Sequence, residues 1–184
     1  MCEVCGQGGN QESRQVKILV SFSGGRTSAY MGWWLKYHTD HELKFVFMNT
    51  GCEHPATLEF LNECDRRWNL DLIWLEAVVN HEGKGHGFGT RHKVVDFKTA
   101  ARDGAPMEDT IKKYGIPNPA FPHCTRETKL HPFKSYVRDN DLNDWATAIG
   151  IRSDEFDRAN PKHKELNIIY PLLTMNPTNE DSVR

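Results

Sequence analysis

The chain has 184 residues and a formal net charge of −2 at pH 7. This length suits one globular domain that buries a core without disulfides or metal. The near-neutral charge lacks the positive field of a protein whose main partner is nucleic acid or an anionic membrane. No apolar run approaches the ~20 residues that cross a bilayer, and the N-terminus is too polar for a signal peptide. We therefore expect a cytoplasmic protein with neither a membrane nor a nucleic-acid partner.

The cysteines and the N-terminal segment bear on metal binding. Five cysteines are an odd number, which argues against a disulfide framework in a chain without an export signal. Residues 1–15 are rich in Gly, Gln, Asn and Ser and predict a flexible leader, followed by a single domain over 16–184. Cys2 and Cys5 have the spacing of half a zinc site, and together with Cys124 they are the candidate metal ligands. Because four ligands are needed and no second CxxC exists, zinc is disfavoured.

Apolar runs and breakers predict alternating strands and helices along the chain. In chain order we expect a strand at 16–22, a helix at 29–35, a strand at 44–49, a helix at 55–68, a strand at 71–79, a helix at 106–114, a helix at 127–138, and strands at 145–150 and 167–170. This alternation predicts an α/β three-layer sandwich with a mostly parallel, twisted sheet. The glycine-rich residues 81–90 predict a loop over a site. Residues 178–184 predict the start of a helix that stops after two turns, as in a shortened natural tail or a truncated gene product.

A glycine pair directly follows the first predicted strand, in the loop Ser23-Gly24-Gly25-Arg26-Thr27-Ser28. Two glycines let the backbone turn sharply, and the helix that follows directs its positive N-terminus at the same place, a geometry that suits a phosphate. The hydroxyls and Arg26 offer further donors. The alternative is an ordinary strand-to-helix turn with Ser/Thr caps. The spacings of Walker A and of GxGxxG dinucleotide sites are both absent.

The segment SFSGGRTS resembles the SGGxDS signature of the adenine nucleotide alpha-hydrolase (PP-loop) superfamily, which includes ATP pyrophosphatases and phosphoadenosine phosphosulfate (PAPS) reductases. Further segments follow in the order found in PAPS reductases: Asn49-Thr50-Gly51 before Pro55, Cys124 to Lys129 with Pro132-Phe133, Gly150-Ile151-Arg152 with Arg158 beyond, and Tyr170-Pro171-Leu172. The ordered match covers roughly residues 16–175. It is most similar to compact PAPS reductase-like proteins of phage genomes.

This resemblance implies a Rossmann-like, adenine nucleotide alpha-hydrolase-like fold and an enzyme that binds an adenine (sulfo)nucleotide, PAPS or ATP, with Mg as a compatible cofactor. The implied catalytic residues are Lys129, Arg152 and Cys124. The implied nucleotide-binding residues are Phe22, Ser23, Gly24, Gly25, Arg26, Thr27, Ser28, Met48, Asn49, Thr50, Gly51, Arg152 and Arg158. The resemblance implies that the loop holds the phosphates and that the backbone near Phe22 and Met48 holds adenine. A reductase would need a thiol reductant partner, a homodimer is compatible, and a phage-encoded protein would work in the host cytoplasm.

Departures from the family pattern leave three hypotheses open. Thr27 stands where the signature carries aspartate, which weakens an ATP pyrophosphatase assignment, and no cysteine follows Cys124, so the terminal nucleophile of the reductases is missing. An iron–sulfur cluster is disfavoured because Cys124 lacks a neighbouring cysteine. The hypotheses are a sulfonucleotide reductase-like enzyme, an ATP-using adenylating enzyme, and a non-catalytic nucleotide binder. Cys52 is interpreted as a small buried thiol rather than a nucleophile, and His81, His86 and His92 as histidines without a metal.

Overall fold

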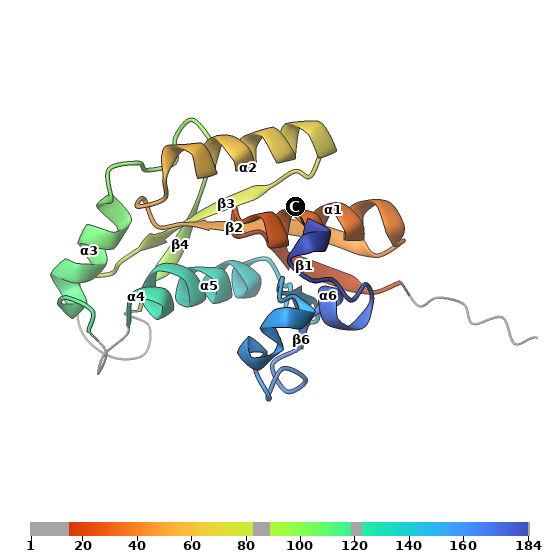
Figure 1. Cartoon of the computed structure of the whole chain (residues 1–184). Coiled ribbons are helices and arrows are strands. Elements are labelled where there is room, and N and C mark those ends of the chain that lie inside the picture. Colours follow the sequence, from red (N-terminus) through yellow and green to blue (C-terminus); the bar gives the residue numbers. More distant parts are fainter. Residues whose placement is uncertain (1–14, 83–88, 119–122, 184) are drawn as a thin grey trace, which may run out of the picture.

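A computed structural model describes residues 15–82, 89–118 and 123–183 (Figure 1). Within these residues six strands form one sheet in the order β4-β3-β2-β1-β5-β6. The strands are β1 (Lys17–Ser21), β2 (Glu42–Asn49), β3 (Ile73–Val78), β4 (Arg91–Val95), β5 (Ala146–Ala148) and β6 (Ile168–Ile169). Neighbouring strands run parallel except β3 and β4, which are antiparallel. The predicted mostly parallel sheet is confirmed.

Helices lie on both faces of the sheet and complete a three-layer arrangement (Figure 1). The α-helices are α1 (Arg26–His38), α2 (Pro55–Trp68), α3 (Ala105–Tyr114), α4 (His123–Thr125), α5 (His131–Asp139) and α6 (Pro171–Thr174). A π-helical segment η1 (Arg126–Leu130) joins α4 to α5, and 3-10 turns form η2 (Ser153–Arg158) and η3 (Asp181–Val183). α1 and α2 cover one face of the sheet, and α5 covers the other.

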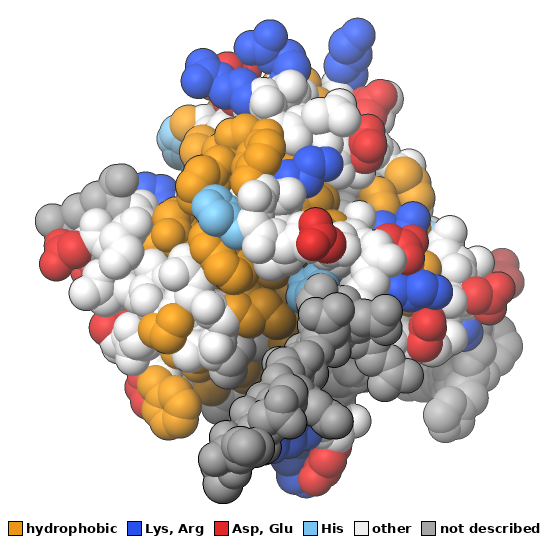
Figure 2. Space-filling model, turned by 90° about the vertical axis from the view of Figure 1, so that its right-hand side faces the viewer, with side chains coloured by type: hydrophobic (Ala, Val, Ile, Leu, Met, Phe, Trp, Pro, Cys, Tyr) orange, Lys and Arg blue, Asp and Glu red, His pale blue; other side chains and the backbone are white. Residues whose placement is uncertain are grey.

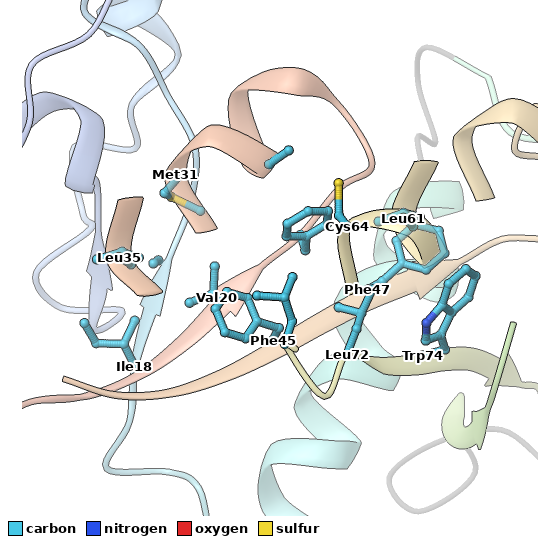
Figure 3. Close-up of a cluster of buried hydrophobic side chains, with 14 of the residues drawn as sticks. Ile18, Val20, Met31, Leu35, Phe45, Phe47, Leu61, Cys64, Leu72 and Trp74 are labelled. Carbon is cyan, nitrogen blue, oxygen red and sulfur yellow. The ribbon is translucent and has the colours of Figure 1, made fainter. Parts of the chain in front are cut away.

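The strands bury side chains on both faces, as the period of two in a pleated strand requires. In β1, Ile18 and Val20 belong to the cluster that includes Met31 and Leu35 of α1, whereas Leu19 packs on the opposite face. Figure 3 shows the first cluster, with Phe45 and Phe47 of β2 reaching toward the helices that carry Met31, Leu35, Leu61 and Cys64. The second cluster lies between the sheet and α5 and consists of Leu19, Val46, Leu75, Tyr136, Leu142 and Trp145. Two apolar faces therefore fix the sheet between its helices.

The edge strand β4 was not predicted from the sequence. Its five residues, Arg91 to Val95, are exposed or half-buried, so the strand lacks the apolar signal of a buried one. Charged side chains are common on edge strands, where they discourage pairing with another chain. The helix predicted at 127–138 was also placed too late, because α4, η1 and α5 follow one another without a break from His123. Of the helix predicted after Thr178, only the short 3-10 turn η3 forms within the described residues.

The end of the molecule where α1 terminates carries aromatic side chains. Trp33 contacts Tyr30, Tyr37 and His38, and Trp34 stacks on His38 with a ring-centroid distance of 5.7 Å. Figure 2 views the molecule from this side and shows hydrophobic side chains gathered in a band. In the part of the chain that the structure describes, no helix combines the length and apolar character needed to span a membrane.

Candidate functional site

The loop after β1 lies where the direction of the sheet connections reverses. β1 pairs with β2 on one side and with β5 on the other, and open α/β sheets bind their ligands at the carboxyl ends of strands at such a switch point. The segment after β5 reaches this loop directly, because Arg152 Nη1 donates to Thr27 Oγ1 at 3.0 Å. A Cβ on Gly150 would lie 3.3 Å from Ser28 Cα, so the two segments touch backbone to backbone.

Gly24 has a conformation and surroundings that admit only glycine. Its φ is +79°, in the left-handed region that disfavours residues with a Cβ. An added Cβ would also lie 2.5 Å from Thr57 Cγ2 and 3.3 Å from Leu61 Cδ1, both on α2. The loop is therefore pressed against the first turns of α2, and its course depends on this glycine.

Gly25 differs, because any residue can adopt its backbone conformation. It is the N-cap of α1 with φ −89° and ψ 155°, and no side chain caps the helix. The nearest atom to an added Cβ is Ser23 Oγ at 3.7 Å, an ordinary contact. Gly25 is exposed, so a side chain here would occupy the mouth of the loop.

Ser28 and Ser23 hold the loop together from inside. The buried Ser28 Oγ donates to Gly25 O at 2.8 Å and accepts from Ser23 N at 3.1 Å and Ser23 Oγ at 3.0 Å. Both serine protons are thus used within the loop, although the sequence suggested that they point toward a ligand. Thr27 differs, since its oxygen accepts from Arg152 and its own proton stays available.

The loop presents a row of backbone donors without partners among the described residues: the amides of Gly24, Gly25, Arg26 and Thr27. The first amides of a helix cannot pair within it, and they carry the positive end of the helix dipole. Arg26 is exposed, and its side chain has no ion pair within the described ranges. This end of α1 therefore has the donors and the electrostatics of an anion-binding site.

Arg152 is the predicted cation that the structure brings to the loop. Its side chain is only 16% exposed, and it makes paired hydrogen bonds to both carboxylate oxygens of Asp154, at 3.0 and 2.9 Å. The hydrogen bond from Arg152 holds the pKa of Asp154 below its usual value. Arg158 lies further out, is 65% exposed and pairs with Glu155, which in turn lies 3.6 Å from Arg152 Nη1.

The Asn49-Thr50-Gly51 turn at the end of β2 is held by a buried carboxylate. Asn49 is fully buried, and its amide nitrogen donates to Glu76 Oε1 at 2.6 Å and to Ala101 O at 2.9 Å. Glu76, also fully buried, accepts from the Ala101 amide at 2.6 Å, and its second oxygen lies 2.9 Å from Lys93 Nζ. Asn49 therefore positions the turn and does not face solvent. The sequence gives one signal for this cluster, a lone glutamate within the apolar strand β3.

Phe22 and Met48, implied as neighbours of adenine, lie at the ends of β1 and β2. The Phe22 side chain is 1% exposed and belongs to the core, and its amide donates to Val46 O at 2.9 Å. Met48 is half-buried and packs against the cluster beneath α5. The structure places both residues at the expected edge of the sheet, and contact with adenine stays a prediction.

Lys129 and Cys124 make no hydrogen bond or ion pair with the loop after β1 in the part of the chain that the structure describes. Lys129 is an exposed residue of η1, which contacts β2 and β3, and it has no ion pair with another described residue. Cys124 is half-buried in α4, and its carbonyl accepts from Thr128 Oγ1 at 2.8 Å. Their assignment to catalysis stays a prediction.

The interpretation of Cys52 as a buried thiol is wrong. Cys52 is exposed, because it follows Gly51 in the turn at the carboxyl edge of the sheet, whereas Cys64 is buried in α2. Burial raises the pKa of the Cys64 thiol to about 11. Cys52 is thus the more accessible of these two thiols.

The metal hypotheses gain no support from the described residues. Among them no group of three His, Cys, Asp or Glu side chains is arranged to hold a metal ion. Cys2, Cys5 and His86 lie outside the described residues. His81 pairs with Asp109 at 2.9 Å and His92 lies 2.9 Å from Ser135 Oγ, so both have other partners.

Comparisons with known proteins agree with this geometry. The family model of the phosphoadenosine phosphosulfate reductase domain matches residues 17–177. The chain belongs to this family. The uncharacterized nin region protein ORF290 of Escherichia phage lambda is 40% identical over 148 residues, which cover 78% of this chain and 51% of that protein. The uncharacterized protein MJ0066 of Methanocaldococcus jannaschii is 26% identical over 82% of this chain and 26% of that protein.

The fold of this family is also found in a solved structure. The crystal structure of phosphoadenylyl-sulfate (PAPS) reductase from Candida auris, a phosphate complex, aligns with a TM-score of 0.53 and 15% identity over 91% of this chain and 69% of that chain. The fold is therefore PAPS reductase-like. The chain spans about half the length of the phage relative and about a quarter of the archaeal one.

Proposed function

We propose that the chain binds the phosphates of an adenine nucleotide in the loop from Ser23 to Ser28, as part of a PAPS reductase-like enzyme whose domain comprises residues 16–184. The observation that carries this proposal is the row of unpartnered amides at the N-terminus of α1, beside Thr27 and Arg152. Backbone amides at a helix N-terminus bind phosphate without any charged side chain of their own. Arg152 adds a guanidinium held in place by Asp154.

Membership of the family favours an adenine nucleotide over a free phosphate. The related Candida auris reductase was solved as a phosphate complex, which shows that a protein of this fold takes up the anion. In the present chain, the loop lies at the carboxyl ends of the neighbouring strands β1 and β5, the place where open α/β sheets bind their ligands. We infer that the 5′ phosphates lie over Gly24 and Gly25, and that the adenine lies toward Met48.

The decisive experiment is calorimetric titration with ATP and with PAPS of the wild type and two matched variants, Gly25→Asp and Gly25→Asn. Both side chains fit the extended backbone of Gly25, and both are favoured N-caps, so α1 is kept in either variant. Only aspartate adds a negative charge at the mouth of the loop. We expect Gly25→Asp to weaken binding by on the order of 100-fold, since juxtaposed like charges cost several kcal/mol, and Gly25→Asn to weaken it far less. Equal affinity of all three proteins would contradict the proposal.

The preferred nucleotide then separates reductase-like chemistry from adenylating chemistry. Preference for PAPS supports the first, in which a thiol attacks sulfur and the nucleotide leaves. Cys52 and Cys124 are then the described thiols to replace by serine, one at a time, because Cys64 is buried with a raised pKa. Release of pyrophosphate from ATP supports the second, and tight binding without turnover supports a nucleotide-sequestering protein.

The remaining partners are proposals of the same rank. A reductase would require a thiol reductant to regenerate its cysteine, and a homodimer is compatible with this hypothesis. Similarity to a phage lambda protein is consistent with a protein that functions in the cytoplasm of the phage's host. Mg²⁺ is proposed only as a companion of ATP. The chain has Thr27 where the signature has aspartate, so it lacks that carboxylate as a magnesium ligand.

A further inference from the structure

A cavity opens between β4 and α5, on the face of the sheet opposite α1. Its volume is about 210 Å³. The residues that line it are Gly89, Thr90, Arg91, His131, Lys134, Ser135 and Arg138. None of them belongs to the loop after β1 or to the residues predicted for nucleotide binding or catalysis. We call this cavity the β4–α5 pocket.

The β4–α5 pocket is lined by cations and by no described carboxylate. Arg91, Lys134 and Arg138 carry permanent charges, and His131 adds a fourth basic group. Lys134 is exposed and has no ion pair with any residue that the structure describes. Positive side chains that converge on one concave surface raise the local concentration of anions.

Two carboxylates, Asp139 and Glu127, pair with basic side chains of this surface and neutralise only part of its positive charge. Asp139 is shared between Arg138 Nε at 2.8 Å and Arg91 Nη1 at 3.9 Å. Glu127 is 2% exposed and is occupied by Thr90, Arg126 and His131 at 2.7, 2.9 and 3.0 Å. Both acids thus orient the basic side chains and leave Lys134 without a counter-charge.

Buried hydroxyl groups distinguish the pocket from a patch of surface lysines. Thr90 and Ser135 line it, although they are only 5% and 4% exposed. Ser135 Oγ accepts from Arg138 Nη2 at 3.4 Å, donates to Asp139 Oδ2 at 3.4 Å and lies 2.9 Å from His92 Nδ1. Thr90 donates to the buried Glu127. The buried hydroxyls therefore help to position the charged side chains around the pocket, as charge-assisted recognition of an oxyanion requires.

The size of the pocket selects a single group rather than a whole nucleotide. A water molecule takes about 30 Å³ of liquid, and pockets for drug-sized ligands begin near 300 Å³. A volume of 210 Å³ lies between these and holds one tetrahedral oxyanion with some water. We propose that the β4–α5 pocket binds an oxyanion of the phosphate or sulfate class, held by Arg91, Lys134 and Arg138.

The position of the pocket favours an anion that is not part of the nucleotide in the loop. Arg91 pairs with Val78, the last residue of β3, so the pocket and the loop share the carboxyl edge of the sheet. β4 and β1 are three strand spacings apart, about 14 Å at ~4.8 Å each. The 5′ and 3′ phosphates of one nucleotide share a ribose and lie closer together. The oxyanion therefore belongs to a second, acidic small molecule, and this inference does not rest on nucleotide binding by the loop.

The test uses ¹⁵N-labelled protein titrated with inorganic phosphate, with sodium chloride at matched ionic strength as the control. In the wild type and in Gly25→Asp, we expect saturable shifts of the Arg91 and Ser135 amides that chloride does not produce. Lys134→Gln and Arg138→Gln should each weaken this binding about tenfold, the value of one hydrogen bond to a charged group. Lys164→Gln, which removes an exposed lysine near β6 at the opposite edge of the sheet, should leave it unchanged.

Each outcome decides the proposal. Shifts confined to residues 23–28, equal shifts with chloride, or full binding in both Lys134→Gln and Arg138→Gln would overturn it. A competition with adenosine 3′,5′-bisphosphate identifies the source of the anion. If the nucleotide displaces phosphate from the pocket in the wild type but not in Gly25→Asp, the oxyanion is the nucleotide's second phosphate. If phosphate stays bound, a separate molecule supplies it.

Discussion

The loop after β1 and the β4–α5 pocket both lie at the carboxyl end of the parallel strands, but they offer an anion different chemistry. The loop presents backbone amides fixed by Gly24 and by the start of α1. The pocket presents the charged side chains of an edge strand and a helix. Binding by amides depends on the path of the chain, whereas binding by side chains depends on residue identity. Substitutions should therefore disrupt the two sites by different routes.

The largest effect should follow from Gly24→Ala, which disturbs the backbone of the loop. The new Cβ meets Thr57 Cγ2 at 2.5 Å in a backbone conformation that disfavours alanine. Overpacking and left-handed strain each cost 1–3 kcal/mol, so we expect unfolding free energy to fall by on the order of 3 kcal/mol in urea titrations. Adding Thr57→Ser removes the Cγ2 atom and should restore about half of this loss. Phosphate binding in the β4–α5 pocket should survive, and its loss would show that the two sites are not separate.

Glu76→Ala should come next, because this carboxylate joins three segments of the fold. Glu76 accepts hydrogen bonds from Asn49 of β2 and from the Ala101 amide, and it pairs with Lys93 of β4. Its removal leaves the Asn49 and Ala101 donors buried without their acceptor, which should cost about 3 kcal/mol of unfolding free energy. The control is Lys93→Ala, whose 52% exposed side chain should matter less. Equal losses in both variants would show that the ion pair, not the hydrogen bonds, carries the stability.

Arg152→Gln should change binding more than stability. Its guanidinium joins Thr27 to Asp154 beside the loop. Loss of a hydrogen bond to a charged group is worth about 1.5 kcal/mol, so nucleotide affinity in calorimetry should fall about tenfold. Arg152→Lys should not rescue it, since lysine cannot reproduce the paired geometry. Arg158→Gln is the matched comparison and should have a smaller effect, because that side chain is 65% exposed. An equal loss of nucleotide affinity in Arg158→Gln would contradict a specific role of Arg152 in binding.

The smallest effect concerns the pH dependence of stability at the pocket. Burial raises the pKa of Glu127, but hydrogen bonds from Thr90, Arg126 and His131 outweigh it and leave the pKa below its usual value of 4.5. A carboxylate with a lowered pKa in the folded state contributes stability above its unfolded pKa, and this contribution is lost as the pH falls through the folded value. The difference in unfolding free energy between wild type and Glu127→Gln should therefore shrink on acidification. A constant difference would contradict the assigned pKa direction.

The two strand–helix units at the start of the domain were largely predictable from the sequence. Buried residues such as Ile18, Val20, Phe45 and Phe47 alternate along their strands, and Pro55 begins α2 as expected. Local patterns are strong here because each strand is buried on both faces. β4 escaped prediction because its residues are exposed or half-buried and do not give the apolar pattern of a buried strand.

The candidate site was predictable where it depends on local chain geometry. The glycine pair, the start of α1 and the sheet class all follow from short sequence patterns and from resemblance to the PAPS reductase family. Arg152 was named from that resemblance, but its bond to Thr27 joins residues on two different connections of the sheet. No local pattern encodes that contact.

The sequence by itself determined the class of fold, the position of the glycine loop and the absence of a strong overall charge. Only the tertiary structure decided that Cys52 is exposed, that Glu76 is buried against Asn49, and that Arg91 meets Arg138 around one cavity. The physical reason is that the burial and the neighbours of a side chain depend on contacts between distant segments, which the chain makes only on folding.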